Sequence, residues 1–131
     1  MTWGHIALLL AGIVGLVEST WGLTSPEKLR AAVSKVTEQT PDRNVGMGLF
    51  FAAAAVVLWL LMSPDKMPSD WALMLLSWVL AGGAYVNFRK RGFHDLVGIL
   101  ILNRTTGAIR LLYAVEFILA LTLVLLAVFK Y

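Results

Sequence analysis

The chain has 131 residues, of which 59% are hydrophobic and 15% charged, whereas about 25% of the residues in soluble domains are charged. This length fits one domain, and this balance excludes an ordinary soluble core. The net charge of +3 does not indicate nucleic-acid binding, because the basic residues stand beside the ends of apolar segments, where they meet anionic lipid. The absence of cysteine excludes disulfides and thiolate metal sites.

Four long apolar segments follow one another, at residues 5–23, 45–62, 71–88 and 108–129. Each has the roughly 18–22 residues that a helix needs to cross ~30 Å of hydrocarbon. None shows the regular polar face of a helix in a soluble bundle. The sequence therefore predicts a single all-α domain, 1–131, folded as a polytopic four-transmembrane-helix bundle.

Basic residues gather in two loops, 24–44 and 89–107, whereas the opposite ends carry Lys66 and Lys130. The positive-inside rule places both loops in the cytoplasm and both termini in the periplasm. The residues expected to meet the lipid interface are Lys28, Arg30, Arg89, Lys90 and Arg91.

The two halves of the chain align without gaps at an offset of 67 residues, which places Gly15 on Gly82 and Arg43 on Arg110. The halves, 5–62 and 71–129, are predicted to be two parallel hairpin repeats. Each contains a short extra helix on the cytoplasmic side. The first, at 25–39, is amphipathic and suits the membrane surface. The second, at 93–103, is more apolar but too short to span, which indicates a re-entrant or protein-covered helix.

Small residues allow helices to approach closely in lipid. The predicted packing positions are Gly12, Gly15, Gly82 and Gly83. Trp78, in the middle of the third apolar segment, is a candidate for packing or for stacking on a ligand.

Glu18 and Glu116 are carboxylates inside predicted spans, near the cytoplasmic side. A charged side chain in hydrocarbon costs about 2.5–3.5 kcal/mol on insertion scales, so each should face the protein and have a partner. The natural partners are Arg43, Arg110 and the Arg89–Arg91 cluster, because a guanidinium binds a carboxylate with two hydrogen bonds. The candidate intramembrane polar residues are Glu18, Glu116, Arg43, Arg110, Tyr85, Asn87 and Tyr113. The alternatives are a structural ion pair, a site for a proton, a cation or an amphiphile, and a glutamate that reaches the membrane surface or contacts another subunit.

The pattern of Glu18, Pro26, the sequence TPD at 40–42, Gly46 and Gly48 resembles the YjeT-like small inner-membrane proteins over about residues 5–62. The layout of the complete chain also resembles the DoxX-like four-helix proteins. That resemblance makes Arg43, Arg89 or Arg91, and Glu116 the matching positions. It implies a bacterial inner membrane and no particular activity.

The pattern as a whole predicts a small, non-enzymatic accessory or scaffold subunit that associates with itself or with a larger membrane complex. Its partners would be membrane lipids and other subunits, and a bound lipid is compatible with this role. No catalytic residue, metal site or cofactor is predicted. The alternative is a homo-oligomeric transporter or channel that uses Glu18 and Glu116. A membrane enzyme acting on lipid or quinone is a third reading, for which the sequence supplies no catalytic motif.

Overall fold

The computed structural model describes residues 2–62 and 67–129. These residues form six α-helices and no strand, and 86% of the chain is helical. The predicted all-α class is therefore confirmed. Lys66 and Lys130, which entered the charge argument, lie outside the described residues.

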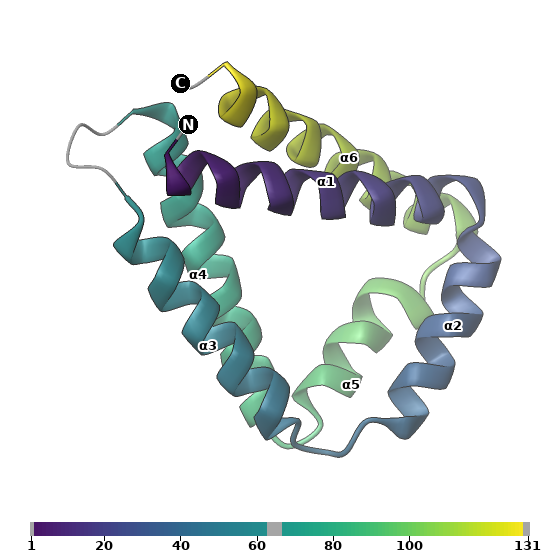
Figure 1. Ribbon diagram of the computed structural model, residues 1–131. Helices are drawn as coiled ribbons and strands as arrows, with labels where there is room; N and C mark the ends of the chain where they lie inside the picture. Colours follow the sequence, from purple (N-terminus) through teal and green to yellow (C-terminus); the bar gives the residue numbers. More distant parts are fainter. Residues whose placement is uncertain (1, 63–66, 130–131) are drawn as a thin grey trace.

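The helices in chain order are α1 (Trp3–Thr24), α2 (Pro26–Gln39), α3 (Val45–Leu60), α4 (Pro68–Phe88), α5 (Gly92–Val97) and α6 (Thr106–Val128), and a π-helical segment, η1 (Gly98–Leu102), continues α5 (Figure 1). The side chains of Thr2, Asn44 and Thr105 cap α1, α3 and α6 by accepting backbone N–H bonds in the first turn. Pro26 and Pro68 open α2 and α4, where a helix needs no N–H donor.

Within the described residues, α1, α4 and α6 are long and apolar enough to cross a membrane. Their lengths are 22, 21 and 23 residues. α3 is apolar as well but has 16 residues, a length of about 24 Å. Three of the four predicted spans thus have the required length, and α3 is shorter than the segment predicted at 45–62.

α1 and α6 form one antiparallel pair. A Cβ atom added at Gly12 would lie 2.9 Å from the Ala120 carbonyl oxygen, and one added at Gly15 would lie 2.8 Å from the Ala120 Cβ. Further along α1, Gly22 lies against the ring of Tyr113. The predicted packing role of Gly12 and Gly15 is thus seen in this pair, whose backbones approach closely because those positions lack side chains.

α3 and α4 form the second antiparallel pair. The Ser77 hydroxyl of α4 donates a buried 2.7 Å hydrogen bond to the Ala55 carbonyl of α3. Phe51 of α3 covers Gly83, which is a predicted packing position. Gly82, the neighbouring predicted position, has no heavy atom of the described structure within 4 Å of where its Cβ would be. One of the two glycines therefore serves the pair, and the other faces outward.

The two pairs meet at one end, around a core cluster of Leu8, Leu58, Leu73 and Ala127. From that end they diverge, and α2 connects their far ends, so that the pairs and α2 outline a triangle with α5 inside it (Figure 1). A second cluster, Leu29, Ile109 and Tyr113, fixes α2 against α6 near the far end of the α1–α6 pair. The core is thus divided between two corners of the triangle.

This arrangement differs from the predicted hairpins within each half of the chain. α1 pairs with α6 and α3 pairs with α4, so the first helix of each half packs on the last helix of the other half. The physical reason is the connection. α2 is a rigid 14-residue rod between α1 and α3, about 21 Å long, whereas α3 and α4 follow each other closely in the sequence. The proposed repeat positions also differ, because Gly15 contacts α6 while Gly82 is open.

Candidate functional site

Glu18 of α1 and Glu116 of α6 lie at the same level of their pair. The antiparallel register places them between the Gly15–Ala120 contact and the contact of Gly22 with the Tyr113 ring. Glu18 is exposed and Glu116 is half-buried. The two carboxylates are close enough to repel each other electrostatically. The structure therefore brings together the two acidic residues that the sequence singled out.

The predicted ion pairs of these carboxylates are absent from the described residues. The ion pairs found there are Glu27–Arg30, at 3.1 Å, and Asp42–Arg91, at 3.4 Å. Arg43 is exposed in the turn before α3, and α3 does not belong to the α1–α6 pair. Arg110 is exposed on α6, six residues before Glu116, and at about 100° per residue it faces a direction roughly 120° away.

Tyr113 completes a three-residue group with the two carboxylates. Its side chain is 3% exposed and packs on Gly22. The phenol is near enough to interact electrostatically with both Glu18 and Glu116, but it has no hydrogen bond within residues 2–62 and 67–129. We call Glu18, Tyr113 and Glu116 the acidic group. It combines two like charges and an unbonded hydroxyl on adjacent apolar helices.

A shallow apolar groove begins at the acidic group. Its volume is about 490 Å³, and it is lined by Ile13, Val14, Val17, Glu18 and Trp21 along one side of α1. Glu18 supplies the charged end of this otherwise apolar surface. A molecule or a helix lying in the groove would therefore reach the carboxylate from the side.

Two other predicted members of the polar group lie elsewhere. Tyr85 is exposed on α4. Asn87 is buried, its side-chain amide donates a 2.8 Å hydrogen bond to the Gly83 carbonyl, and its main-chain carbonyl accepts the Asn44 N–H at 2.9 Å. Both are therefore separated from the acidic group, because α4 pairs with α3. Asn87 has a structural role at the junction of α3 and α4.

The basic residues predicted for the lipid interface divide into two kinds. Lys28, Arg89 and Lys90 are exposed, as a lipid contact requires. Arg30 instead pairs with Glu27 and donates to the Arg104 carbonyl, while Glu27 accepts from Thr106. This link between α2 and the start of α6 was not anticipated. The Ser25–Pro26–Glu27 pattern indicates a helix start, but nothing in it identifies Thr106 as a partner.

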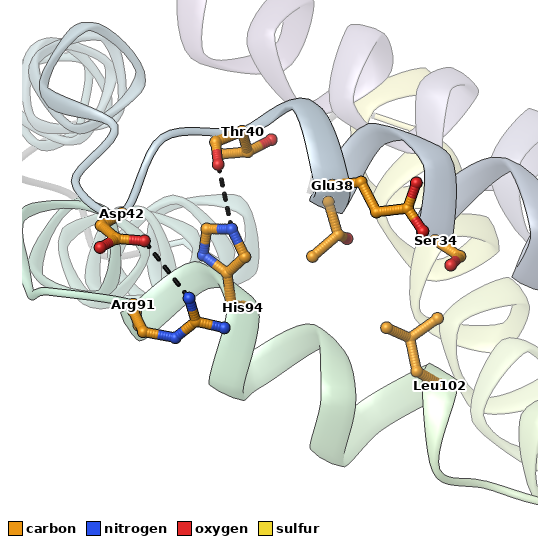
Figure 2. Close-up of a pocket in the computed structure, with 8 residues that line it drawn as sticks. Ser34, Glu38, Thr40, Asp42, Arg91, His94 and Leu102 are labelled. Carbon is orange, nitrogen blue, oxygen red and sulfur yellow. Dashed lines mark hydrogen bonds and ion pairs between the residues drawn. The ribbon is translucent and has the colours of Figure 1, made fainter.

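A polar pocket lies between the second half of α2 and the α5–η1 segment, and we call it the α2–α5 pocket (Figure 2). Its volume is about 390 Å³, and its lining residues are Ser34, Thr37, Glu38, Thr40, Asp42, Arg91, His94 and Leu102. No sequence pattern predicts this pocket, because its residues come from two segments about 50 positions apart.

Backbone contacts fix the α5 side of this pocket. The Arg91 N–H donates to the Asp42 carbonyl at 2.7 Å, and Arg91 has a left-handed backbone with φ of 57°. Gly92 then packs directly on the Val86 carbonyl, where a Cβ has no room. Nε2 of His94 donates a 3.0 Å hydrogen bond to the Thr40 carbonyl, and its Nδ1 is buried without a partner among the described residues. The pocket wall is therefore held by main-chain contacts.

Comparisons with protein families, with curated proteins and with solved structures find no match to this chain. The resemblance to YjeT-like and DoxX-like proteins therefore stays a prediction. The residues at the two sites above are the remaining guide to function.

Proposed function

We propose that this chain is an integral accessory subunit of a bacterial inner membrane, which associates through its helices with itself or with a larger membrane complex. α1, α3, α4 and α6 cross the bilayer in this proposal. α3 is short, but it packs along α4 and so occupies the same depth. Both termini are periplasmic, and the regions 24–44 and 89–107 are cytoplasmic.

One feature of α4 supports the association most directly. A stripe at helical spacing runs along its exposed side and consists of Trp71, Leu75, Trp78, Gly82 and Tyr85. Beside it, Ala55, Ser77 and Ala81 contribute small side chains to a groove of about 370 Å³ between α3 and α4. In lipid, helix association depends on close packing at small residues. Gly82 offers such a position, and no described part of the chain covers it.

The test of association compares Gly82→Leu with a matched control, Gly46→Leu. A Cβ at either position meets no heavy atom of the described structure within 4 Å, so neither change should disturb the fold of the chain. The wild type, extracted in mild detergent, should copurify in a larger stoichiometric complex. The Gly82→Leu variant should no longer copurify with that complex, while the Gly46→Leu variant should still do so. A wild-type chain that runs as a monomer in every detergent and in nanodiscs would contradict the proposal.

The absence of cysteine makes the membrane orientation directly measurable. Single substitutions Thr2→Cys and Lys35→Cys place one thiol at each proposed side. An impermeant thiol reagent added to intact spheroplasts should label position 2 and leave position 35 unlabelled until the cells are lysed. The reverse labelling pattern would overturn the orientation.

A second candidate function is transport of a proton, a cation or a small amphiphile by a homo-oligomer. The observation that favours it is the acidic group, in which Glu18 and Glu116 adjoin each other and have no cation partner among the described residues. Folded Glu18→Gln and Glu116→Gln variants should then lose flux in liposomes. Asp95→Asn, an exposed change on α5, serves as the control. Flux that is unchanged in both glutamate variants would exclude the carboxylates as carriers.

A further inference from the structure

The α2–α5 pocket is built at the height where the polar headgroups of a bilayer would lie in the proposed orientation. α2 lies across the far ends of the two helix pairs, and α5 lies inside the triangle (Figure 1). The α2 wall is amphipathic, whereas the opposite wall continues into apolar side chains. Leu102 reaches the pocket, and the η1 segment that carries it also exposes Ile99. The site thus joins a polar chamber to a surface that suits acyl chains.

Glu38 stands apart from the Arg91–Asp42 ion pair, which lies at the other end of the pocket. Arg91 lies just before α5 and His94 comes from α5, while Glu38 and Ser34 extend from α2 further along the pocket (Figure 2). The Arg91 guanidinium makes one 3.4 Å contact with Asp42, and its remaining guanidinium N–H groups have no partner within the described parts of the chain. Glu38 has neither an ion pair nor a hydrogen bond there. One end therefore offers free donors to an anion, and the other offers a free carboxylate to a cation.

We propose that this pocket binds the headgroup of a zwitterionic phospholipid that carries a primary ammonium, as in phosphatidylethanolamine. The phosphate accepts hydrogen bonds from Arg91, and the ammonium donates to Glu38 and to the Ser34 hydroxyl. The acyl chains lie along Leu102 and the exposed apolar side chains of η1. A pocket of this volume is within the range of about 300–1,000 Å³ that is usual for small-molecule sites.

The lining also distinguishes between headgroups. A quaternary ammonium has no N–H to donate, and proteins hold it with aromatic rings. The lining residues include no Phe, Tyr or Trp, so phosphatidylcholine does not fit the Glu38 end. Phosphatidylglycerol presents the phosphate but no cation. The pocket is therefore expected to bind phosphatidylethanolamine more tightly than either of the other two lipids.

The experiment is native mass spectrometry of the purified full chain with each of these three lipids, all with the same acyl chains. Phosphatidylethanolamine should bind about tenfold or more tightly than phosphatidylcholine, as one hydrogen bond to a charged group requires. Glu38→Gln should remove this preference and leave phosphatidylglycerol binding unchanged. Arg91→Gln should weaken the binding of all three. The control variant Asp95→Asn, which is exposed and outside the lining, should behave as the wild type.

Equal binding of phosphatidylethanolamine and phosphatidylcholine, or an unchanged preference in Glu38→Gln, would overturn the inference. Glu38→Gln keeps the test independent of folding, because Glu38 is exposed and has no partner in the described structure. A further measurement uses glycerophosphoethanolamine, the soluble headgroup without acyl chains. If it binds as tightly as phosphatidylethanolamine, the acyl chains contribute nothing and the ligand is not a lipid. The inference rests on the membrane location in the proposed function. A chain absent from the membrane fraction refutes that location, whereas a membrane-bound chain without headgroup preference refutes the inference alone.

Discussion

Gly12→Ala is expected to destabilise the α1–α6 pair because the added methyl group meets the backbone of α6. Its Cβ would lie 2.9 Å from the Ala120 carbonyl oxygen, 3.1 Å from the Val124 nitrogen and 2.6 Å from the Val124 Cγ2, where ordinary contacts are 3.4–4 Å. A side-chain rotation could relieve the contact with Cγ2 but not the contacts with the main chain. The helices must therefore move apart by about half an ångström or more, and overpacking of this kind costs about 1–3 kcal/mol.

Alanine also favours a helix over glycine by about 1 kcal/mol, which would obscure the packing cost in a single variant. Gly46→Ala supplies the correction, since it brings a similar propensity gain at a position of α3 with no neighbour within 4 Å in the described structure. The difference in stability between the two variants should thus be about 1–3 kcal/mol. This stability difference is measured by titrating the detergent-solubilised chain with SDS and following the loss of helical circular dichroism. Equal stability of the two variants would refute the close approach of α1 and α6.

Three further substitutions test other contacts with the same titration. Ser77→Ala removes the buried hydrogen bond to the Ala55 carbonyl and should lower the stability by about 0.6–1.5 kcal/mol. A variant as stable as the wild type would contradict this hydrogen bond. Glu18→Gln removes an exposed carboxylate without an ion pair in the described structure from an apolar helix and should raise stability, whereas a loss would indicate a partner for Glu18. Gly92→Ala forces a Cβ against the Val86 carbonyl of α4. It should lower the stability by about 1–3 kcal/mol and abolish headgroup binding. A variant that behaves as the wild type would exclude the tight contact between α4 and the start of α5.

The apolar periodicity of the sequence is enough to predict the helices, because each long helix is marked by its own composition. Predicted and observed boundaries agree within a few residues, as for 71–88 and Pro68–Phe88. The pairing of those helices was not predictable in the same way. Most of their surface is apolar, so hydrophobicity does not distinguish one neighbour from another. The choice depends on the rigid length of α2 and on where glycine lets a backbone approach.

The same distinction between what the sequence predicts and what only the fold determines applies to the candidate sites. Glu18 and Glu116 stand out in the sequence because a carboxylate is costly in an apolar segment, and the structure places them together. The prediction of arginine partners rests on guanidinium–carboxylate chemistry, which does not determine distance. The α2–α5 pocket combines residues that are individually unremarkable in the sequence. Only the fold of the α2–α3 turn onto the α4–α5 junction, through the backbone bond from Arg91 to Asp42, makes them neighbours.

The divergence of the two helix pairs has a consequence for the lipids around the chain. The pairs touch at the end that carries the termini and stand apart at the end bridged by α2 (Figure 1). Embedded in the proposed orientation, the molecule has a larger cross-sectional area in the cytoplasmic leaflet than in the periplasmic one. Such a wedge displaces unequal numbers of lipids from the two leaflets, and it fits best where the bilayer curves away from the wide end.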